Sequence, residues 1–560
     1  MYNQRLKIVS DNRYPLLVTL GFFIIVLYVS FFHHNYWIWD QDGFYYLSLG
    51  KEIINGNGQN VIVFDAPIAG LVFYAFLDSF FNNGFVVLKI ISIVCSTAII
   101  FVTFFIIRNI FESKIALLGQ LFLAFNPSFG FFATLAEIEM LPLFLMYLSL
   151  YFVTKKLLQY SDMIIIGSLL GISYMFRYSS ISVLVTILIF SLLLKKNKLH
   201  YFVILLGFFI LVISPTIILH YTNEVLSNVE PTYYMFSYAK YKNEYWIEQM
   251  KESLGKGFTH AIFADFDLFI KNYLYNLFYN IPAKIFNFNE IRNNASLIPA
   301  VPFVGIIPIA GGLFFVLRSK QEKTNLKPLL LLPIVFAVTH SIVLLYYAEQ
   351  YFIIWIFIAT ISSVFFIKIY EEKSKLILVI VITIFILNTG YEYVFIKTTS
   401  SGEPFRNIKD EFSNLFNNEP LEAIGIEVKT IGDVIKQHSK SDDDYVMANQ
   451  FFYSYYTGKK QLYGNFNEGP SNDKIENYIM RKNWKDYEIF ISNAMSFPID
   501  RKNIYNPIPD FVIYDPHPRF KQHEYLKILE NPNHPDIPSN FEFLYKSERT
   551  NIVVYKIHHD

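Results

Sequence analysis

Residues 84–107 read GFVVLKIISIVCSTAIIFVTFFII, an apolar run whose one charged residue is Lys89. An α-helix rises 1.5 Å per residue, so about 20 residues cross a hydrocarbon core about 30 Å thick. This run is long enough to do so. It predicts a helix that spans a membrane.

Similar runs recur along the first two thirds of the chain. We predict eleven spans, at residues 15–32, 84–107, 115–133, 140–154, 162–176, 179–194, 201–219, 298–317, 328–347, 350–368 and 376–396. A shorter run at residues 66–81 carries Asp78 and is interpreted as an interfacial or re-entrant helix, although it could span. The first span has no small-residue cleavage site after it, so we interpret it as a retained anchor and not a signal peptide.

The composition of the 560-residue chain agrees with a polytopic membrane protein. Hydrophobic residues make up 53% and charged residues 17%, against about 25% charged residues in an ordinary soluble protein. The 47 basic and 47 acidic residues cancel, which argues against a nucleic-acid partner bound through bulk charge. The single cysteine, Cys95, excludes an intrachain disulfide and a Cys-rich zinc site.

The composition changes near residue 397. Residues 398–560 hold 24 of the 47 acidic residues and no apolar run near 18 residues. A helix is predicted at 423–440, and strands at 444–448, 511–515, 541–545 and 552–556, the last two as a hairpin. We therefore predict a multi-span domain at 1–397 and a soluble, non-catalytic α/β domain at 398–560.

The distribution of basic residues predicts the orientation. With the N-terminus in the cytoplasm, 17 Lys and Arg residues fall in cytoplasmic segments, and the short outer loops hold only Lys51 and Arg177. Cytoplasmic loops of membrane proteins carry the excess of Lys and Arg. This split favours eleven spans, outer loops at 33–83 and 220–297, and a C-terminal domain outside the cytoplasm of a cell-membrane protein.

The first outer loop contains the most informative pattern. Asp40 and Asp42 follow the first span directly, and an amphipathic helix is predicted after them, ending at Asn55-Gly56-Asn57-Gly58. Such carboxylates can accept a proton from an attacking hydroxyl or hold a divalent metal. The structural alternative is that Asp42 caps the helix, which is compatible with catalysis.

Further ionisable residues gather at the predicted outer ends of other helices. Glu137 and Glu139 lie at one such boundary, Arg177 at the next, and Glu349 before a later span. Ionisable groups at membrane depth are costly and tend to mark functional sites. The alternative for each residue is an ordinary polar helix end. Together with the first loop, the cluster favours a site at the outer face.

The layout resembles the GT-C superfold of membrane glycosyltransferases. Within it, the chain is most similar to the dolichyl-phosphate-mannose protein mannosyltransferases and the lipid A aminoarabinose transferase. Asp42, Tyr46, Gly50 and Gly56 match their first-loop pattern, but Gly43 stands where the family has Glu. Asp40 could replace that Glu, or the frame could shift so that Asp40 is the essential acid.

A second match surrounds Arg177, where Gly171–Ser179 resembles a turn of the same family. Near Glu349 the match is weaker, because Gln350 replaces the family's Arg. The resemblance covers about residues 15–396 in layout. The chain has no tandem Trp-Trp-Asp sequence, which argues against an oligosaccharyltransferase catalytic subunit.

The resemblance implies transfer of a hexosyl or pentosyl group from a polyprenyl- or dolichyl-phosphate sugar to a protein or lipid acceptor, with inversion. Asp42 or Asp40 is the expected base, and Arg177 is the expected contact to the leaving phosphate. Tyr46, Glu137, Glu139 and Glu349 are further candidates for substrate binding. No cofactor is required if Arg177 supplies the charge, although Asp40 and Asp42 could hold Mg²⁺ or Mn²⁺.

The alternative function is a transporter or flippase for a lipid or a polar solute. Transporters commonly show internal repeats and broken helices near the midplane of the membrane. The sequence shows no repeat, and its ionisable residues lie at the predicted outer edge. We therefore favour the glycosyltransferase.

Overall fold

The computed structural model of the protein describes residues 13–32, 41–54, 67–81, 83–194, 197–222, 258–282, 306–318, 324–342, 352–372, 422–441, 444–448, 451–462, 510–516, 524–535, 537, 539–548 and 550–558. Asp40, Glu349 and the span predicted at 376–396 lie outside these ranges.

The chain forms two compact units. The first holds residues 1–30, 63–70 and 86–400, and the second holds 31–62, 71–85 and 401–560. The division predicted at residue 397 assigns the whole first outer loop to the membrane domain. By internal contacts, residues 31–62 and 71–85 group with residues 401–560, and the predicted domain bounds stay a prediction.

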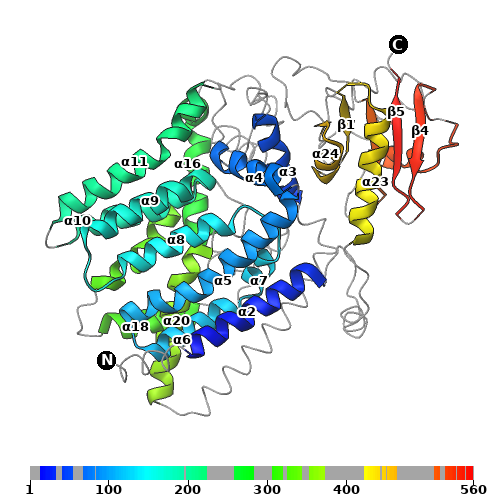
Figure 1. Cartoon of the computed structure of the whole chain (residues 1–560). Coiled ribbons are helices and arrows are strands. Elements are labelled where there is room, and N and C mark those ends of the chain that lie inside the picture. The colour runs from blue at the N-terminus through cyan, green and yellow to red at the C-terminus, as the bar shows by residue number, and fades with distance from the viewer. Residues whose placement is uncertain are drawn as a thin grey trace. The chain divides into compact units, whose positions relative to one another are not determined.

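The first unit consists of helices (Figure 1). Their bounds are α2 Arg13–Phe32, α5 Gly84–Ile110 (from residue 86), α6 Ser113–Ala124, α7 Pro127–Ala133, α8 Met140–Val153, α9 Tyr160–Phe176, α10 Ser180–Leu192, α11 Lys198–Thr222, α15 Phe258–Ala264, α16 Phe266–Tyr275, η5 Asn276–Asn280, α18 Ile306–Arg318, η8 Thr324–Leu326, α19 Lys327–His340 and α20 Phe352–Glu372.

Four of the helices in the described ranges are long and apolar enough to cross a membrane, namely α2, α5, α11 and α20. The helices α6, α8, α9, α10, α18 and α19 are apolar but shorter. This pattern agrees with a helical membrane protein. The count of eleven spans remains a prediction.

One predicted span, 115–133, is two helices and not one. The chain leaves the helical path after α6 at Phe125, and α7 begins at Pro127. Asn126 Oδ1 accepts a hydrogen bond from Phe129 N at 3.0 Å, which caps the new helix. Proline has no N–H group and suits the first turn of a helix, where no intrahelical acceptor exists. The Asn126-Pro127 pair therefore explains the break.

The helices α8, α9 and α11 lie side by side in the first unit (Figure 1). The contact between α9 and α11 is close, because a Cβ atom at Gly167 would lie 2.5 Å from Leu205 O. Small residues at helix crossings allow such close approach in membrane proteins. The helix α20 packs on α6 and α18, and 78% of its candidate span is buried, against 22% for α11. This places α20 in the centre of the unit and α11 at its edge.

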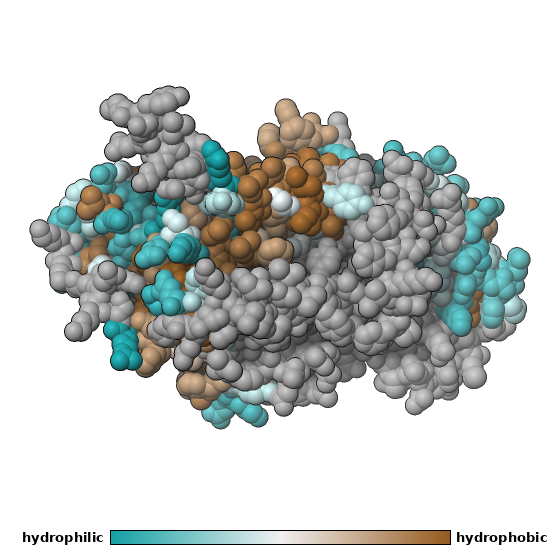
Figure 2. All heavy atoms as spheres, turned by 90° about the horizontal axis from the view of Figure 1, so that it is seen from below, coloured by the Kyte–Doolittle hydropathy of each residue, from teal (hydrophilic) through white to brown (hydrophobic). Residues whose placement is uncertain are grey.

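Apolar side chains also cover much of the outside. Leu16, Leu17 and Ile25 of α2 and Leu211 and Ile218 of α11 are exposed by more than half. Figure 2 shows one face of the protein, on which hydrophobic residues gather in a broad patch. Lipid tails would cover such side chains, since a water-soluble protein seldom exposes large contiguous apolar patches.

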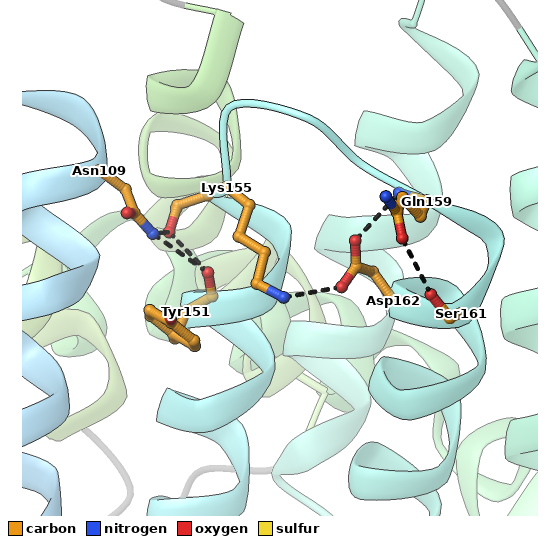
Figure 3. A network of polar contacts seen from close by, with 7 residues as sticks. Asn109, Tyr151, Lys155, Gln159, Ser161 and Asp162 are labelled. Atoms are coloured by element: carbon orange, nitrogen blue, oxygen red, sulfur yellow. Dashed lines mark hydrogen bonds and ion pairs between the residues drawn. The ribbon is translucent and has the colours of Figure 1, made fainter. Parts of the chain in front are cut away.

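A polar network closes the loop between α8 and α9 (Figure 3). Lys155 Nζ lies 2.9 Å from Asp162 Oδ1, and Asp162 Oδ2 accepts a hydrogen bond from Gln159 N at 2.9 Å. The second bond is half of a capping box, which satisfies N–H groups at the start of α9. Asn109 Nδ2 donates to Tyr151 O at 3.4 Å and so joins the end of α5 to α8. The loop is thus held by its own side chains.

The second unit contains α3 Gln41–Glu52, residues 71–81 of α4 Ile68–Phe81, and a sheet formed by the C-terminal residues. The strands are β1 Tyr445–Met447, β2 Lys460–Leu462, β3 Phe511–Tyr514, β4 Phe541–Lys546 and β5 Val553–Ile557, in the order β2-β1-β3-β5-β4. β1 pairs in parallel with β2 and β3, while β5 pairs antiparallel with β3 and β4.

The helices of the C-terminal part are α23 Glu422–His438 and α24 Phe451–Thr457, with the 3-10 helix η10 Glu524–Glu530. The predicted helix at 423–440 corresponds to α23, whose buried face includes Val428, Ile431 and Ile435. The sequence analysis did not predict α24. Its Tyr453 is fully buried, and the hydroxyl group donates to Asp515 Oδ2 at 3.0 Å. Burial, followed by the neighbouring Asp515 carboxylate, raises the pKa of Tyr453 well above its usual value.

Candidate functional site

The candidate base Asp42 lies in the first turn of α3. The helix begins at Gln41, so the peptide dipoles of α3 direct their positive end toward this turn. Asp40, the other candidate, precedes the helix and lies outside the described residues.

The buried face of α3 follows helical spacing. Phe44 and Leu47 are fully buried, and Tyr46 is 1% exposed. The ring of Phe44 stacks on Phe85 with centroids 4.6 Å apart and lies 5.2 Å from the ring of Tyr455. Aromatic packing therefore holds the beginning of α3, two residues after Asp42.

The end of α3 packs closely on α4. A Cβ atom at Gly50 would lie 2.3 Å from Leu71 O and 2.7 Å from the Cβ of Ala75. No side chain fits between backbones at that separation, so the contact requires glycine. This gives a structural reason for Gly50 in the first-loop pattern.

The second group of candidates lies in the first unit, on the segment between α7 and α8. Glu137 and Glu139 are 7% and 6% exposed. The backbone of this segment accepts hydrogen bonds from two neighbouring helices: Ser30 Oγ donates to Thr134 O at 2.9 Å, and Ser92 Oγ donates to Glu137 O at 3.2 Å. These bonds satisfy buried carbonyl groups and tie the segment to α2 and α5.

Arg177 ends α9 in extended conformation, with φ −151° and ψ 128°. Its side chain is buried, and its Nη2 group forms an ion pair with Glu139 Oε1. The partner thus comes from the segment before α8. Ser173 Oγ, one turn earlier in α9, donates to Pro142 O at 2.9 Å and joins the same two helices.

The sequence analysis missed Lys89 as a site residue. Lys89 is 2% exposed in α5, and its Nζ donates to Ser30 O at 3.3 Å. Among the residues that the structure describes, the buried charged side chains at the predicted outer end of the first unit are therefore Lys89, Glu137, Glu139 and Arg177. A lysine near one end of a long apolar run was the available signal, because a buried ammonium group is costly in such a place.

A metal site remains untested. Among the residues that the structure describes, His, Cys, Asp and Glu side chains form no group of three or more suited to a metal ion. His340, which shows no metal-ligand spacing in the sequence, is buried, and its ring stacks on Phe336. Use of Mg²⁺ or Mn²⁺ by Asp40 and Asp42 stays a prediction.

Comparison with known proteins agrees with the layout. Residues 65–219 match the family described as dolichyl-phosphate-mannose-protein mannosyltransferase. No curated protein sequence matches the chain significantly.

Two solved structures share the fold along most of the chain. ArnT from Cupriavidus metallidurans bound to undecaprenyl phosphate is 11% identical with a TM-score of 0.52, covering 96% of this chain and 97% of its own. The archaeal oligosaccharyltransferase AglB from Archaeoglobus fulgidus, in complex with an inhibitory peptide and a dolichol-phosphate, is 11% identical with a TM-score of 0.51, covering 90% and 69%.

These matches show the fold, and they agree with the apolar helices of the first unit. The protein is thus a helical membrane protein whose fold resembles that of ArnT and AglB, and its residues 65–219 resemble the dolichyl-phosphate-mannose-protein mannosyltransferase family.

Proposed function

We propose that the protein transfers a glycosyl group from a polyprenyl-phosphate-linked sugar to an acceptor, with inversion, at the outer face of the membrane. The observation that supports this most strongly is the fold shared with an ArnT structure that holds undecaprenyl phosphate, over 96% of this chain. A donor of this class needs a lipid-facing site for its tail and a polar site for its sugar.

The proposed chemistry is an in-line displacement at the anomeric carbon. An acceptor hydroxyl forms the new glycosidic bond, the bond from carbon to phosphate oxygen breaks, and the polyprenyl phosphate leaves. Asp42, or Asp40 if the frame is shifted, takes the proton of the hydroxyl. The resemblance of the first-loop pattern around Asp42, which lies in the first turn of α3, supports this role.

The leaving phosphate needs positive charge. Arg177 is our first candidate, and Lys89 is added because it is also buried in the first unit. A guanidinium group has five N–H donors and can bind phosphate oxygens in bidentate fashion, which suits Arg177 to this role. Glu137, Glu139, Glu349 and Tyr46 remain candidates for contacts to the sugar or the acceptor.

The test uses purified protein in lipid nanodiscs with radiolabelled undecaprenyl- and dolichyl-phosphate sugars. The measured quantity is the rate at which the polyprenyl phosphate is released. Asp42→Asn should lower turnover about 10²–10⁴-fold, which is the usual contribution of a general base. The amide can still cap a helix, so folding should persist. Glu52→Gln, which changes a carboxylate at the other end of α3, is the matched control.

The outcomes separate the alternatives. If Asp40→Asn abolishes turnover and Asp42→Asn does not, Asp40 is the base. Nuclear magnetic resonance of the product reports whether the anomeric configuration is inverted. A wild-type protein that transfers no sugar from either class of lipid donor, while moving a lipid or solute across the bilayer, would replace the proposal by the transporter alternative.

A further inference from the structure

A buried carboxylate that the proposed chemistry does not use lies beside α3. Asp78, near the end of α4, is 3% exposed. Three donors converge on it: Lys51 Nζ lies 2.5 Å from Oδ2, the hydroxyl of Tyr455 donates to Oδ1 at 2.7 Å, and the backbone N–H of Gly84 also donates to Oδ1. All of these residues belong to the second unit.

The three donors come from three different elements. Lys51 lies in the last turn of α3, Gly84 begins α5, and Tyr455 lies in α24 of the C-terminal part. Figure 1 draws α3 next to α24, and the two helices are in contact. Because Tyr455 is 377 residues from Asp78 along the chain, the carboxylate joins the first outer loop to the C-terminal residues.

The contacts around Lys51 reinforce this junction. The Lys51 ammonium group lies 4.4 Å from the centroid of the Tyr455 ring, so it interacts with both the carboxylate and the ring face. Burial, followed by the hydrogen bond to Asp78, raises the pKa of Tyr455. Its hydroxyl group therefore stays protonated near neutral pH and can donate the hydrogen bond to Asp78.

The junction holds one end of the helix that carries the candidate base. Lys51 is nine positions after Asp42, which is about 14 Å along a helix axis. Phe44 holds the other end through Phe85 and Tyr455. The ring of Tyr455 thus contacts both ends of α3, through Phe44 and Lys51, while its hydroxyl group reaches Asp78 of α4.

We propose that Asp78 is a positioning residue, which together with Lys51 and Tyr455 fixes α3 so that its first turn meets the substrates. The inference rests on the proposed glycosyl transfer. It assigns the C-terminal residues a part in catalysis that requires no contact with the substrate. The helix α24 supplies Tyr455, and without the hydrogen bond from Tyr455 to Asp78 the helix α3 leaves its active orientation.

The experiment compares two tyrosines of the same short helix. Tyr455→Phe removes the hydroxyl group that reaches Asp78 and keeps the ring, whereas Tyr453→Phe removes a buried hydroxyl group that reaches Asp515 instead. Both variants lose one buried hydrogen bond to a carboxylate. Only the first should disturb α3.

Two readouts are measured on full-length protein in nanodiscs. The first is amide hydrogen exchange over residues 41–54, which should be faster in Tyr455→Phe and Asp78→Asn and unchanged in Tyr453→Phe. The second is turnover per folded protein. It should fall about 10- to 100-fold in the same two variants, with the KM for the donor near the wild-type value, since small misplacement of a catalytic group has costs of this size. Lys51→Arg, which keeps the cation, should retain turnover, and Lys51→Met should not.

Each result decides the matter. Faster exchange with unchanged turnover would make the junction a structural contact only and would overturn the proposal. Unchanged exchange in Tyr455→Phe and Asp78→Asn would overturn it as well, as would equal losses in Tyr455→Phe and Tyr453→Phe. If the wild-type protein transfers no sugar, the proposed function fails first. If it transfers sugar and the variants do so equally well, this inference alone fails.

Discussion

The buried pair of Arg177 and Glu139 allows a quantitative test of what holds α9 to the segment before α8. The two side chains are 3% and 7% exposed. Breaking such a pair by removing one partner typically costs about 3–5 kcal/mol, because the other charge stays buried without its counter-ion. Removing both charges together costs much less. Arg177→Met and Glu139→Gln are therefore each expected to destabilise the protein strongly, and the double variant less than the sum.

The expected shift in melting temperature follows from the size of the chain. Unfolding entropy is about 2.1 cal/mol/K per residue, so 560 residues melting as one unit give about 1.2 kcal/mol/K. A loss of 3–5 kcal/mol then lowers Tm by about 3–4 °C. Helices that persist after melting in detergent reduce the entropy, so this figure is a lower bound.

The assay heats detergent-solubilised protein and follows the monodisperse fraction by size-exclusion chromatography. The pair of Lys368 and Glu371 is the matched control, since its side chains are 43% and 42% exposed. An exposed pair contributes at most about 1 kcal/mol, so Lys368→Met should leave Tm nearly unchanged. Donor binding to the surviving Arg177→Met protein shows separately whether Arg177 also contacts phosphate.

Two results would refute the reasoning. Single variants at Arg177 and Glu139 that melt within about 1 °C of the wild type would show that the pair carries little of the stability expected for a buried ion pair. Losses that add in the double variant would show that the two side chains do not interact, because coupled neighbours deviate from additivity by about 0.5–3 kcal/mol.

Three further predictions concern packing and orientation. Gly50→Ala should lower Tm, since a Cβ atom would lie 2.3 Å from Leu71 O and overpacking costs about 1–3 kcal/mol, whereas Gly207→Ala, with no described atom within 4 Å, should not lower it. Tyr147→Phe should destabilise by about 0.5–1.5 kcal/mol, because it removes the buried hydrogen bond from the hydroxyl group to Phe352 O at 2.7 Å; an unchanged Tm would contradict this. A reporter that is active only outside the cytoplasm, fused after Asp560, should be active; an inactive one would indicate an even number of spans.

Much of the architecture follows from local patterns. The number of apolar residues needed to cross a bilayer is known, so the length of an apolar run predicts a span directly. The spans predicted at 84–107 and 201–219 accordingly correspond to α5 and α11. Alternating apolar residues likewise predict β4 and β5, which pair as a hairpin. Helix ends are harder to predict, because they depend on single capping contacts such as that of Asn126 at the break between α6 and α7.

The sequence by itself indicated a helical membrane protein, with an acidic first loop and ionisable groups at helix ends. Only the tertiary structure decided which charges meet. Arg177 pairs with Glu139 across 38 residues of sequence, and Asp78 meets Tyr455 across 377. Local patterns record hydrophobicity and spacing along the chain. A buried charge, in contrast, selects its partner by the distances that helix packing sets between distant segments, and that choice has no local signature.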